Sequence, residues 1–137
     1  MPSAPESGLI RDETGTQRLL GYVLDVGQGD GAARCWLDIA PAHLNRHGVL
    51  HGGVAAALLD NASGATASLS VDETGRAPFL TVSLSIAFVA PAEGGRVMAT
   101  GRKTGGGRGL VFVEARLEHE DGRLIATASG VFKRVRQ

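Results

Sequence analysis

The chain has 137 residues, of which 14 are Lys or Arg and 14 are Asp or Glu, with 43% hydrophobic residues and 20 glycines. This composition fits one globular domain and excludes collagen and a disordered linker, because the glycines follow no three-residue period and the apolar content is high. The balanced charge argues against a nucleic-acid partner, and the single Cys35 excludes an intrachain disulfide. No stretch resembles a signal peptide or a membrane span, so we expect a cytosolic protein without a membrane partner.

The first third of the chain predicts an arm followed by a β-hairpin. Residues 1–16 are polar and without a sustained period, which indicates a flexible arm before a single domain at 17–137. Alternation of apolar residues then runs from Leu19, and again through AARCWLDIA, on either side of an Asp-Gly turn. This pattern is typical of a hairpin, in which Cys35 points inward as a small core residue.

Residues 54–69 form the only good helix candidate, since they are rich in alanine and leucine and lack proline. The segment is apolar almost all round, which predicts a buried helix. A spacing of about 100° per residue places Val54, Leu58, Ala65 and Leu69 on one stripe, which we expect to pack on a sheet.

The remainder of the chain predicts four strands, at 80–88, 96–103, 110–119 and 123–134. In the first of them, the apolar residues at every second position from Leu80 to Phe88 alternate with Thr81, Ser83, Ser85 and Ala87. The connections are short, as in the turn around Asp121-Gly122, so the sheet should be mainly antiparallel and wrap the helix on one side. The expected fold class is α+β.

Asp60 lies in this apolar helix, nearly opposite Leu58, with small residues three and four positions away. Two interpretations are open. Asp60 is either a solvated residue on the outer helix face or a carboxylate in an apolar groove that acts as a general base or nucleophile. Periodicity does not separate them.

His51-Gly52-Gly53 stands where the helix begins. The first amides of a helix have no intrahelical partner, so one of them can hold an oxyanion that develops on a carbonyl. The alternative is an ordinary glycine turn. His51 itself fits a capping or packing role better than proton transfer.

These residues, in this spacing, resemble the hotdog-fold acyl-CoA thioesterases, and most closely the phenylacetate-degradation branch. The resemblance covers roughly residues 40–132. It rests on Asn45, His51-Gly52-Gly53, Leu59-Asp60-Asn61, the strand from Thr81 to Phe88 with the following Pro91-Ala92, and Glu120-Asp121-Gly122-Arg123-Leu124.

The resemblance implies a helix wrapped by an antiparallel sheet and active sites between two subunits. We expect such dimers to form a homotetramer, although the sequence does not itself decide between dimer and tetramer. It implies that Asp60 of one subunit acts with the Gly52 amide and Asn45 of the other, while Thr81 positions water. His51, Gly53, Asn61 and Gly64 would then lie against the acyl-CoA substrate. No metal or other cofactor is implied.

Two further groups of residues are candidates for binding. His43, His47 and His51 recur every four residues, but the loop composition argues against a metal site. We expect Arg96, Arg102, Lys103 and Arg108 around the turn 105–109, where Arg108 either contacts CoA phosphates or is a solvated turn residue.

The sequence therefore predicts a hydrolase that cleaves an aryl or medium-chain acyl-CoA to the free acid and CoA. Two alternatives share the fold: a non-catalytic acyl-CoA or acyl-carrier binding module, and a hydratase or dehydratase. The retained set of Asn45, Gly52 and Asp60 speaks against the first, and the absence of a suitable His-centred pair speaks against the second.

Overall fold

The computed structural model describes residues 8–136. Its elements in chain order are β1 (Leu9–Ile10), α1 (Gly15–Leu20), β2 (Val23–Asp25), β3 (Arg34–Asp38), the 3-10 turn η2 (Pro41–His43), α2 (Gly52–Leu69), β4 (Phe79–Phe88), β5 (Arg96–Gly106), β6 (Leu110–His119) and β7 (Leu124–Arg134). The long helix and the four strands after it agree with the sequence prediction to within a few residues at each end.

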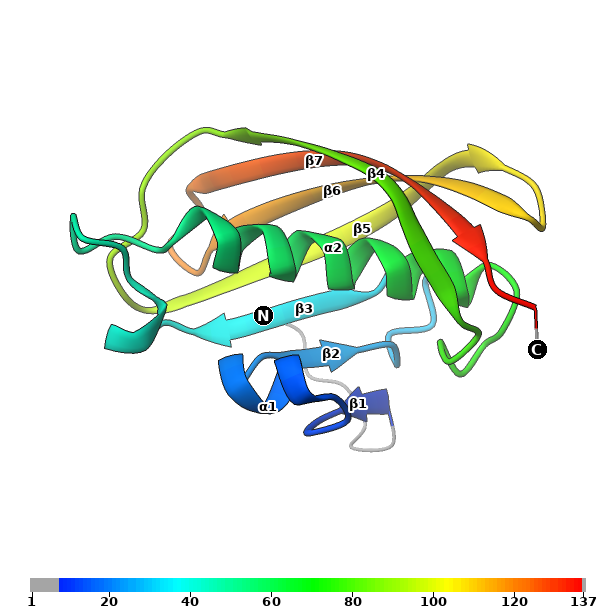
Figure 1. Cartoon of the computed structure of the whole chain (residues 1–137), viewed down its shortest axis with the longest axis horizontal. Coiled ribbons are helices and arrows are strands. Elements are labelled where there is room, and N and C mark those ends of the chain that lie inside the picture. The colour runs from blue at the N-terminus through cyan, green and yellow to red at the C-terminus, as the bar shows by residue number, and fades with distance from the viewer. Residues whose placement is uncertain (1–7, 137) are drawn as a thin grey trace.

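The seven strands of residues 8–136 belong to one antiparallel sheet in the order β1-β2-β3-β5-β6-β7-β4. α2 lies lengthwise across one face of this sheet (Figure 1). The predicted α+β architecture is confirmed. β4 follows α2 in the chain but pairs only with β7, so it forms one edge of the sheet.

The first hairpin is confirmed, since β2 and β3 pair antiparallel with Leu24 opposite Cys35. Its first strand begins later than expected, because Leu19 and Leu20 are the last two residues of the short helix α1. Gly21, in the left-handed conformation, is the C-cap of that helix. A helix of only six residues is too short to show a clear helical period in the sequence, so it is not distinguished from the strand pattern beside it.

The predicted flexible arm at 1–16 differs from the structure where it can be compared. Residues 1–7 lie outside the described residues, but β1 pairs with β2 and α1 begins at Gly15. Gln17 is buried, and its side-chain Nε2 donates to Ile10 O at 2.7 Å and Tyr22 O at 3.1 Å. These contacts join the segment before α1 to the strand after it.

The face of α2 that packs on the sheet is not the predicted leucine stripe. Of that stripe only Leu58 is fully buried; the buried face consists of Ala55, Leu58, Leu59, Ala62, Ser63, Thr66 and Ala67, together with Ser68. Close approach explains the difference, because a Cβ on Gly101 of β5 would lie 2.9 Å from Ala62 O. Small residues bring the helix backbone against the sheet, so side-chain size and not hydrophobicity selects the buried face.

The core lies between α2 and the sheet. In β3 and the residue before it, Ala33, Cys35 and Leu37 are buried, as the alternation predicted. Among residues 8–136, no helix is both long enough and apolar enough to cross a bilayer.

Candidate active site

A β-bulge brings Thr81 onto Asp60. The register of β4 against β7 shifts between Thr81 and Ser83, which leaves Val82 as an extra residue. A bulge reverses the side-chain alternation beyond it, so Thr81 faces α2. Its Oγ1 donates a hydrogen bond of 2.6 Å to Asp60 Oδ1.

Asp60 is the only ionisable residue of α2, and it is half-buried. Its Oδ2 accepts no hydrogen bond from the described part of the chain, so one carboxylate oxygen is held by Thr81 and the other is available. The contact joins half-buried Asp60 of α2 to an exposed side chain of β4, and the catalytic role of Asp60 stays a prediction.

The neighbouring Asn61 is fixed from two sides. Its Nδ2 donates to Ala57 O at 2.7 Å, and its Oδ1 accepts from the Tyr22 hydroxyl at 3.2 Å. Burial raises the pKa of this tyrosine, so Tyr22 remains a neutral donor. Asn61 therefore forms a rigid polar wall beside Asp60.

A cavity of about 430 Å³ is lined by Asp60, Asn61 and Thr81, and it extends along α2 past Gly64 to the buried Ser68. Phe79 and Phe132 form one side of it. We call this space the Asp60 cavity. Gly64 leaves room in its wall, and its predicted contact with substrate stays a prediction.

Gly64→Ala is expected to raise the free energy of unfolding by about 0.5–1 kcal/mol, because alanine loses less conformational entropy than glycine in a helix. The added Cβ would meet nothing closer than Phe132 ring carbons at 3.9 Å. Urea denaturation at unchanged m value measures the difference. A lower stability would show that the cavity wall has no room at this position.

The first two amides of α2 differ in role: the Gly53 N–H takes part in capping the helix, and the Gly52 N–H is left available. His51 caps the helix, since its Nδ1 accepts a hydrogen bond of 2.8 Å from Gly53 N. A Cβ on Gly53 would lie 3.0 Å from this imidazole, which explains the glycine. The Gly52 N–H donates to no atom of residues 8–136, so it is the available donor. The capping role preferred for His51 is confirmed.

Asn45 and Gly52 line a second cavity, of about 380 Å³, which we call the Gly52 cavity. Asn45 Oδ1 accepts from His47 N at 2.9 Å and Val49 N at 3.3 Å and so shapes the loop. Its Nδ2 has no partner among the described residues, so Asn45 can act on a ligand only as a donor.

One chain does not bring all the predicted catalytic residues together. Asp60 and Gly52 line different cavities and are eight residues apart on one helix. At 1.5 Å per residue, their backbones are separated by about 12 Å along the axis. A reacting carbonyl lies about 3 Å from both its nucleophile and its oxyanion donor, so these two residues of the same chain do not share one carbonyl.

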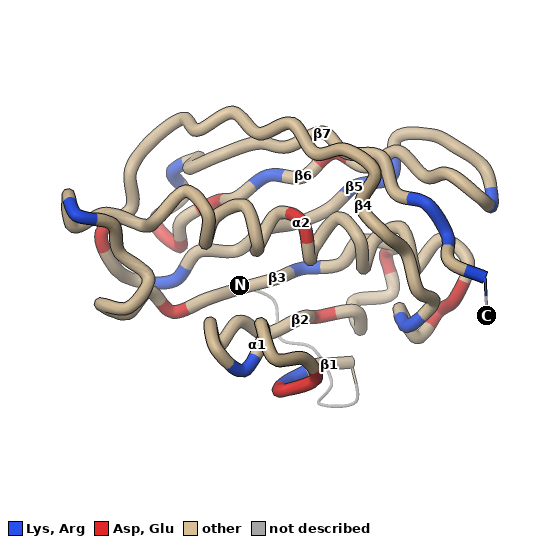
Figure 2. The backbone as a smooth tube through the Cα atoms, in the orientation of Figure 1, with Lys and Arg blue, Asp and Glu red and all other residues tan. Residues whose placement is uncertain are grey.

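Arg108 lies in a cationic groove of about 600 Å³ together with Lys133, Arg134 and Arg136. None of the four forms an ion pair within the described residues. The basic end of β7 and the tip of the β5–β6 hairpin lie at the same end of the molecule (Figure 2). Sequence reasoning missed the three C-terminal cations, although they form a short basic run at the end of β7 and just beyond it.

Arg96 does not belong to this end. It lies at the start of β5, pairs with Asp38 at 2.7 Å and stacks on Trp36 at 3.8 Å from the ring centroid. Arg102 is held by Glu114 at 2.8 Å. Grouping these arginines around the turn at 105–109 was therefore wrong for Arg96, because β5 carries it to the far end of the sheet.

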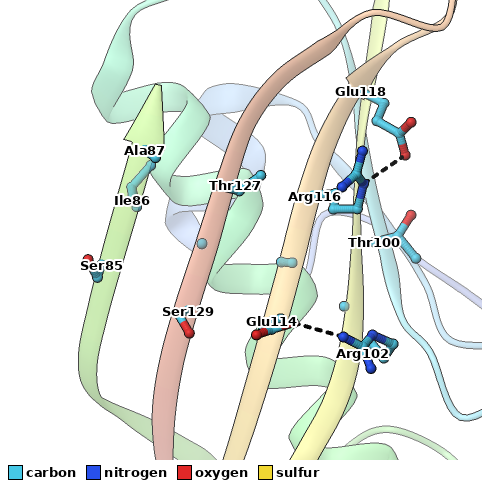
Figure 3. A pocket seen from close by; sticks show the side chains of 13 residues that line it. Ser85, Ile86, Ala87, Thr100, Arg102, Glu114, Arg116, Glu118, Thr127 and Ser129 are labelled. Carbon is cyan, nitrogen blue, oxygen red and sulfur yellow. Dashed lines mark hydrogen bonds and ion pairs between the residues drawn. The ribbon is translucent and has the colours of Figure 1, made fainter. Parts of the chain in front are cut away.

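A larger hollow, of about 640 Å³, lies over the face of the sheet that points away from α2 (Figure 3). Arg102 pairs with Glu114 there, and Arg116 lies 3.9 Å from Glu118. These charges neutralise one another, and no predicted site residue lines this hollow. It is therefore not the candidate active site.

The remaining candidate side chains have structural roles. His43 is buried; its Nδ1 accepts from Ala40 N at 2.9 Å and its Nε2 lies 2.7 Å from Leu20 O. Burial raises the pKa of the Cys35 thiol, so this side chain is a poor nucleophile. No cluster of potential metal ligands occurs among residues 8–136.

Comparisons with known proteins identify the family of this chain. The sequence profile of the thioesterase superfamily matches residues 47–126, which include the start of α2, Asp60 and Thr81. The chain is 34% identical over 112 residues to acyl-coenzyme A thioesterase 13 of Homo sapiens, covering 80% of this chain and 78% of that protein. The mouse protein of the same name is 32% identical over 114 residues, with 82% and 79% covered. The chain therefore belongs to the thioesterase superfamily, a class of thioester hydrolases.

Solved structures share the fold. A Bacillus halodurans protein solved with CoA superposes with a TM-score of 0.82 at 26% identity and covers 93% of this chain and 83% of that chain. The PaaI protein from the phenylacetic acid degradation operon of Escherichia coli superposes with a TM-score of 0.79 at 18% identity, over 91% and 87%. The hotdog fold implied by the sequence resemblance is confirmed.

Proposed function

We propose that the protein hydrolyses acyl-CoA thioesters at sites built by two copies of the chain, with Asp60 from one copy and the Gly52 amide and Asn45 from the other. The observation that carries this proposal is the contact of Thr81 with Asp60, which fixes a carboxylate beside a cavity with one oxygen available. Superfamily membership and the acyl-coenzyme A thioesterase relatives support the substrate class.

The free edge of β4 supports the two-copy arrangement. Leu80, Val82 and Phe88 of this edge strand, and Val89 directly after it, are more than half exposed, and such edges are normally covered. Gly52 lies against the Phe88 ring at one end of β4, and Asp60 contacts Thr81 at the other. Antiparallel pairing of two β4 strands about a twofold axis near Leu84 would bring each end beside the opposite end of its partner. Gly52 of one copy then meets Asp60 of the other.

The chemistry follows from these positions. The thioester carbonyl oxygen accepts from the Gly52 N–H, which stabilises the oxyanion. Asp60 removes a proton from water, the resulting hydroxide adds to the carbonyl carbon, and collapse of the intermediate breaks the carbon–sulfur bond. The proton then passes to the thiolate, so that free acid and CoA leave. Direct attack by Asp60 Oδ2 is the second route: it expels the CoA thiolate and forms a mixed anhydride between Asp60 and the acyl group, which water then hydrolyses to the free acid. Detection of this anhydride after rapid quenching of a single turnover distinguishes the two routes.

Thr81→Val is expected to lower kcat/KM by about 10- to 100-fold, because it removes a hydrogen bond to a charged group. Thr81→Ser retains the Oγ and should keep most of the activity. Steady-state thiol release measures both variants. Equal losses in the two, or no loss in either, would contradict the positioning role.

Thiol release from a panel of aryl, short-chain and medium-chain acyl-CoAs tests the function itself. We expect hydrolysis without added metal, and no hydration of enoyl-CoA substrates. Tight binding without thiol release would indicate a binding module, and loss of the enoyl absorbance would indicate a hydratase. The tetramer and the cytosolic location expected from the sequence stay predictions.

A further inference from the structure

We infer that His43 is a positioning residue for the half of the active site that Asn45 and Gly52 form: it fastens the loop that carries them to the end of α1. We call these two residues the Gly52 half. The inference rests on the proposed function, because it concerns the direction of the Gly52 N–H. His43 is only 7% exposed and lines neither the Gly52 cavity nor the Asp60 cavity, so it acts on substrate only through the residues that it holds.

Residues 43–51 form a small hairpin, which we call the Asn45 hairpin. Near its tip, Asn45 N donates to Val49 O at 2.8 Å, and at its base His51 N donates to His43 O at 2.8 Å. The chain enters α2 directly after this base. The position of His43 therefore sets where the hairpin and the first residue of α2 stand.

The Gly52 N–H belongs to the peptide unit between His51 and Gly52, and hydrogen bonds on both sides of His51 hold this unit. The His51 carbonyl accepts from Val54 N and Ala55 N, both at 3.0 Å. The His51 N–H donates to His43 O. The first turn of α2 thus fixes one side and His43 the other. A catalytic donor has to keep its direction to within about 10–20°, so the Gly52 N–H depends on both supports.

Two main-chain groups hold the His43 ring, and together they require the neutral ring with its proton on Nε2. The Ala40 N–H can only donate, so Nδ1 accepts from it at 2.9 Å. Nε2 then carries the proton and donates to Leu20 O at 2.7 Å. The first contact joins residues three positions apart and closes η2, whereas the second spans 23 positions. Only the second contact ties the Asn45 hairpin to another element.

The end of α1 is a firm anchor for this contact. Leu20 is the last residue of α1, so its carbonyl has no intrahelical donor. Gly21 ends the helix, with its N–H donating to Gln17 O at 2.7 Å. The Gln17 side chain is buried and donates to main-chain oxygens of β1 and of the residue before β2. The carbonyl that accepts from His43 is therefore held by its whole surroundings.

Two conservative variants separate the two contacts of the ring. Asparagine places Oδ1 where histidine has Nδ1, so His43→Asn keeps the acceptor for Ala40 and loses the donor to Leu20. Glutamine reaches the position of Nε2, so His43→Gln keeps the donor and loses the acceptor. We expect kcat for thiol release to fall about tenfold in His43→Asn with KM within about twofold, and to stay within about twofold of the wild type in His43→Gln.

A His43→Asn variant at least as active as His43→Gln would show that His43 only closes η2, and it would overturn the inference. His119 is the matched control, because its ring makes the same two kinds of contact. Its Nδ1 accepts from Asp121 N at 3.1 Å, and its Nε2 lies 2.6 Å from Gly94 O. His119 lines neither cavity, so His119→Asn should leave kcat unchanged.

If His43→Asn does not fold, the anchor can be moved from the other side. Gly21 has a φ of +84°, and an added Cβ would meet nothing within 4 Å, so Gly21→Ala strains only the backbone that ends α1. Asparagine tolerates this conformation. We expect kcat to fall by about threefold or more in Gly21→Ala and by less than about twofold in Gly21→Asn. Equal kcat in the wild type and both variants would overturn the inference.

Mixed dimers show which half of the site His43 serves. When a His43→Asn chain pairs with an Asp60→Asn chain, one site combines the unaltered Gly52 half of the second chain with Asp60 of the first. Thiol release should therefore reach about half of the wild-type rate per dimer. If His43→Asn disturbed its whole chain, Asp60 would be affected too, and the rate would stay near about a twentieth of the wild type. That result would overturn the inference.

Pairing Asp60→Asn chains with Gly52→Pro chains separates this inference from the proposed function. Recovery in that heterodimer, with none in the His43→Asn heterodimer, would overturn the inference alone. No recovery in either would overturn the two-copy arrangement, and the comparison of His43→Asn with His43→Gln would still test His43. Absence of hydrolysis by the wild type would overturn the proposed function and this inference together.

Discussion

Asp60→Asn is expected to lower kcat for acyl-CoA hydrolysis by about 10²- to 10⁴-fold, the range for loss of a general base. The asparagine is nearly isosteric and its Oδ1 can still accept from Thr81, so the shape of the cavity is retained. The lost group is the carboxylate that removes the proton from water or attacks the carbonyl. Thiol release under single-turnover conditions measures the chemical step directly.

The control for Asp60→Asn is binding. CoA affinity, measured by calorimetry, should change by less than about threefold, since a neutral amide fills the same volume. The melting temperature should also stay within a few degrees of the wild type. Turnover at the wild-type rate in this variant would remove Asp60 from the mechanism.

Gly52→Pro is expected to lower kcat by about 10²- to 10³-fold, the loss found when one oxyanion donor is removed. Proline at the first helical position removes only an N–H that makes no helical bond. His51 precedes it with φ −63° and ψ 133°, a conformation that a residue before proline adopts readily. The helix should therefore form normally.

Gly52→Ala is the matched control, because it keeps the N–H. Its Cβ would lie 3.4 Å from the Phe88 ring, in van der Waals contact, so a modest effect is expected. Thiol release and circular dichroism of both variants separate the amide from the side chain. Similar losses in the proline and alanine variants would contradict the oxyanion role.

Local sequence patterns predicted most of the fold. The apolar run of α2 and the alternation of the last four strands depend on neighbours in the chain, and they were located correctly. The short helix α1 was missed, because six residues give no clear period. The buried face of α2 was also wrong, because Gly101 lets small residues approach the sheet more closely than leucines.

The candidate site depends more on tertiary pairing. The motif around Gly52 and Asp60 identified the chemistry, but the position of Thr81 depends on the bulge at Val82, which appears only when β4 pairs with β7. The cationic groove joins Arg108 to residues some 25 positions further along the chain. The division of the site between two copies follows from the helical rise between Gly52 and Asp60 together with the free edge of β4.

A mixed dimer tests this division most directly. Asp60→Asn and Gly52→Pro subunits with different affinity tags are coexpressed, and the heterodimer is purified on both tags. If each site combines Asp60 of one copy with Gly52 of the other, one site of the heterodimer is intact and the second carries both defects. Thiol release should then return to about half of the wild-type rate per dimer, although each homodimer is inactive. A heterodimer as inactive as its parents would place both residues in one subunit and contradict the account.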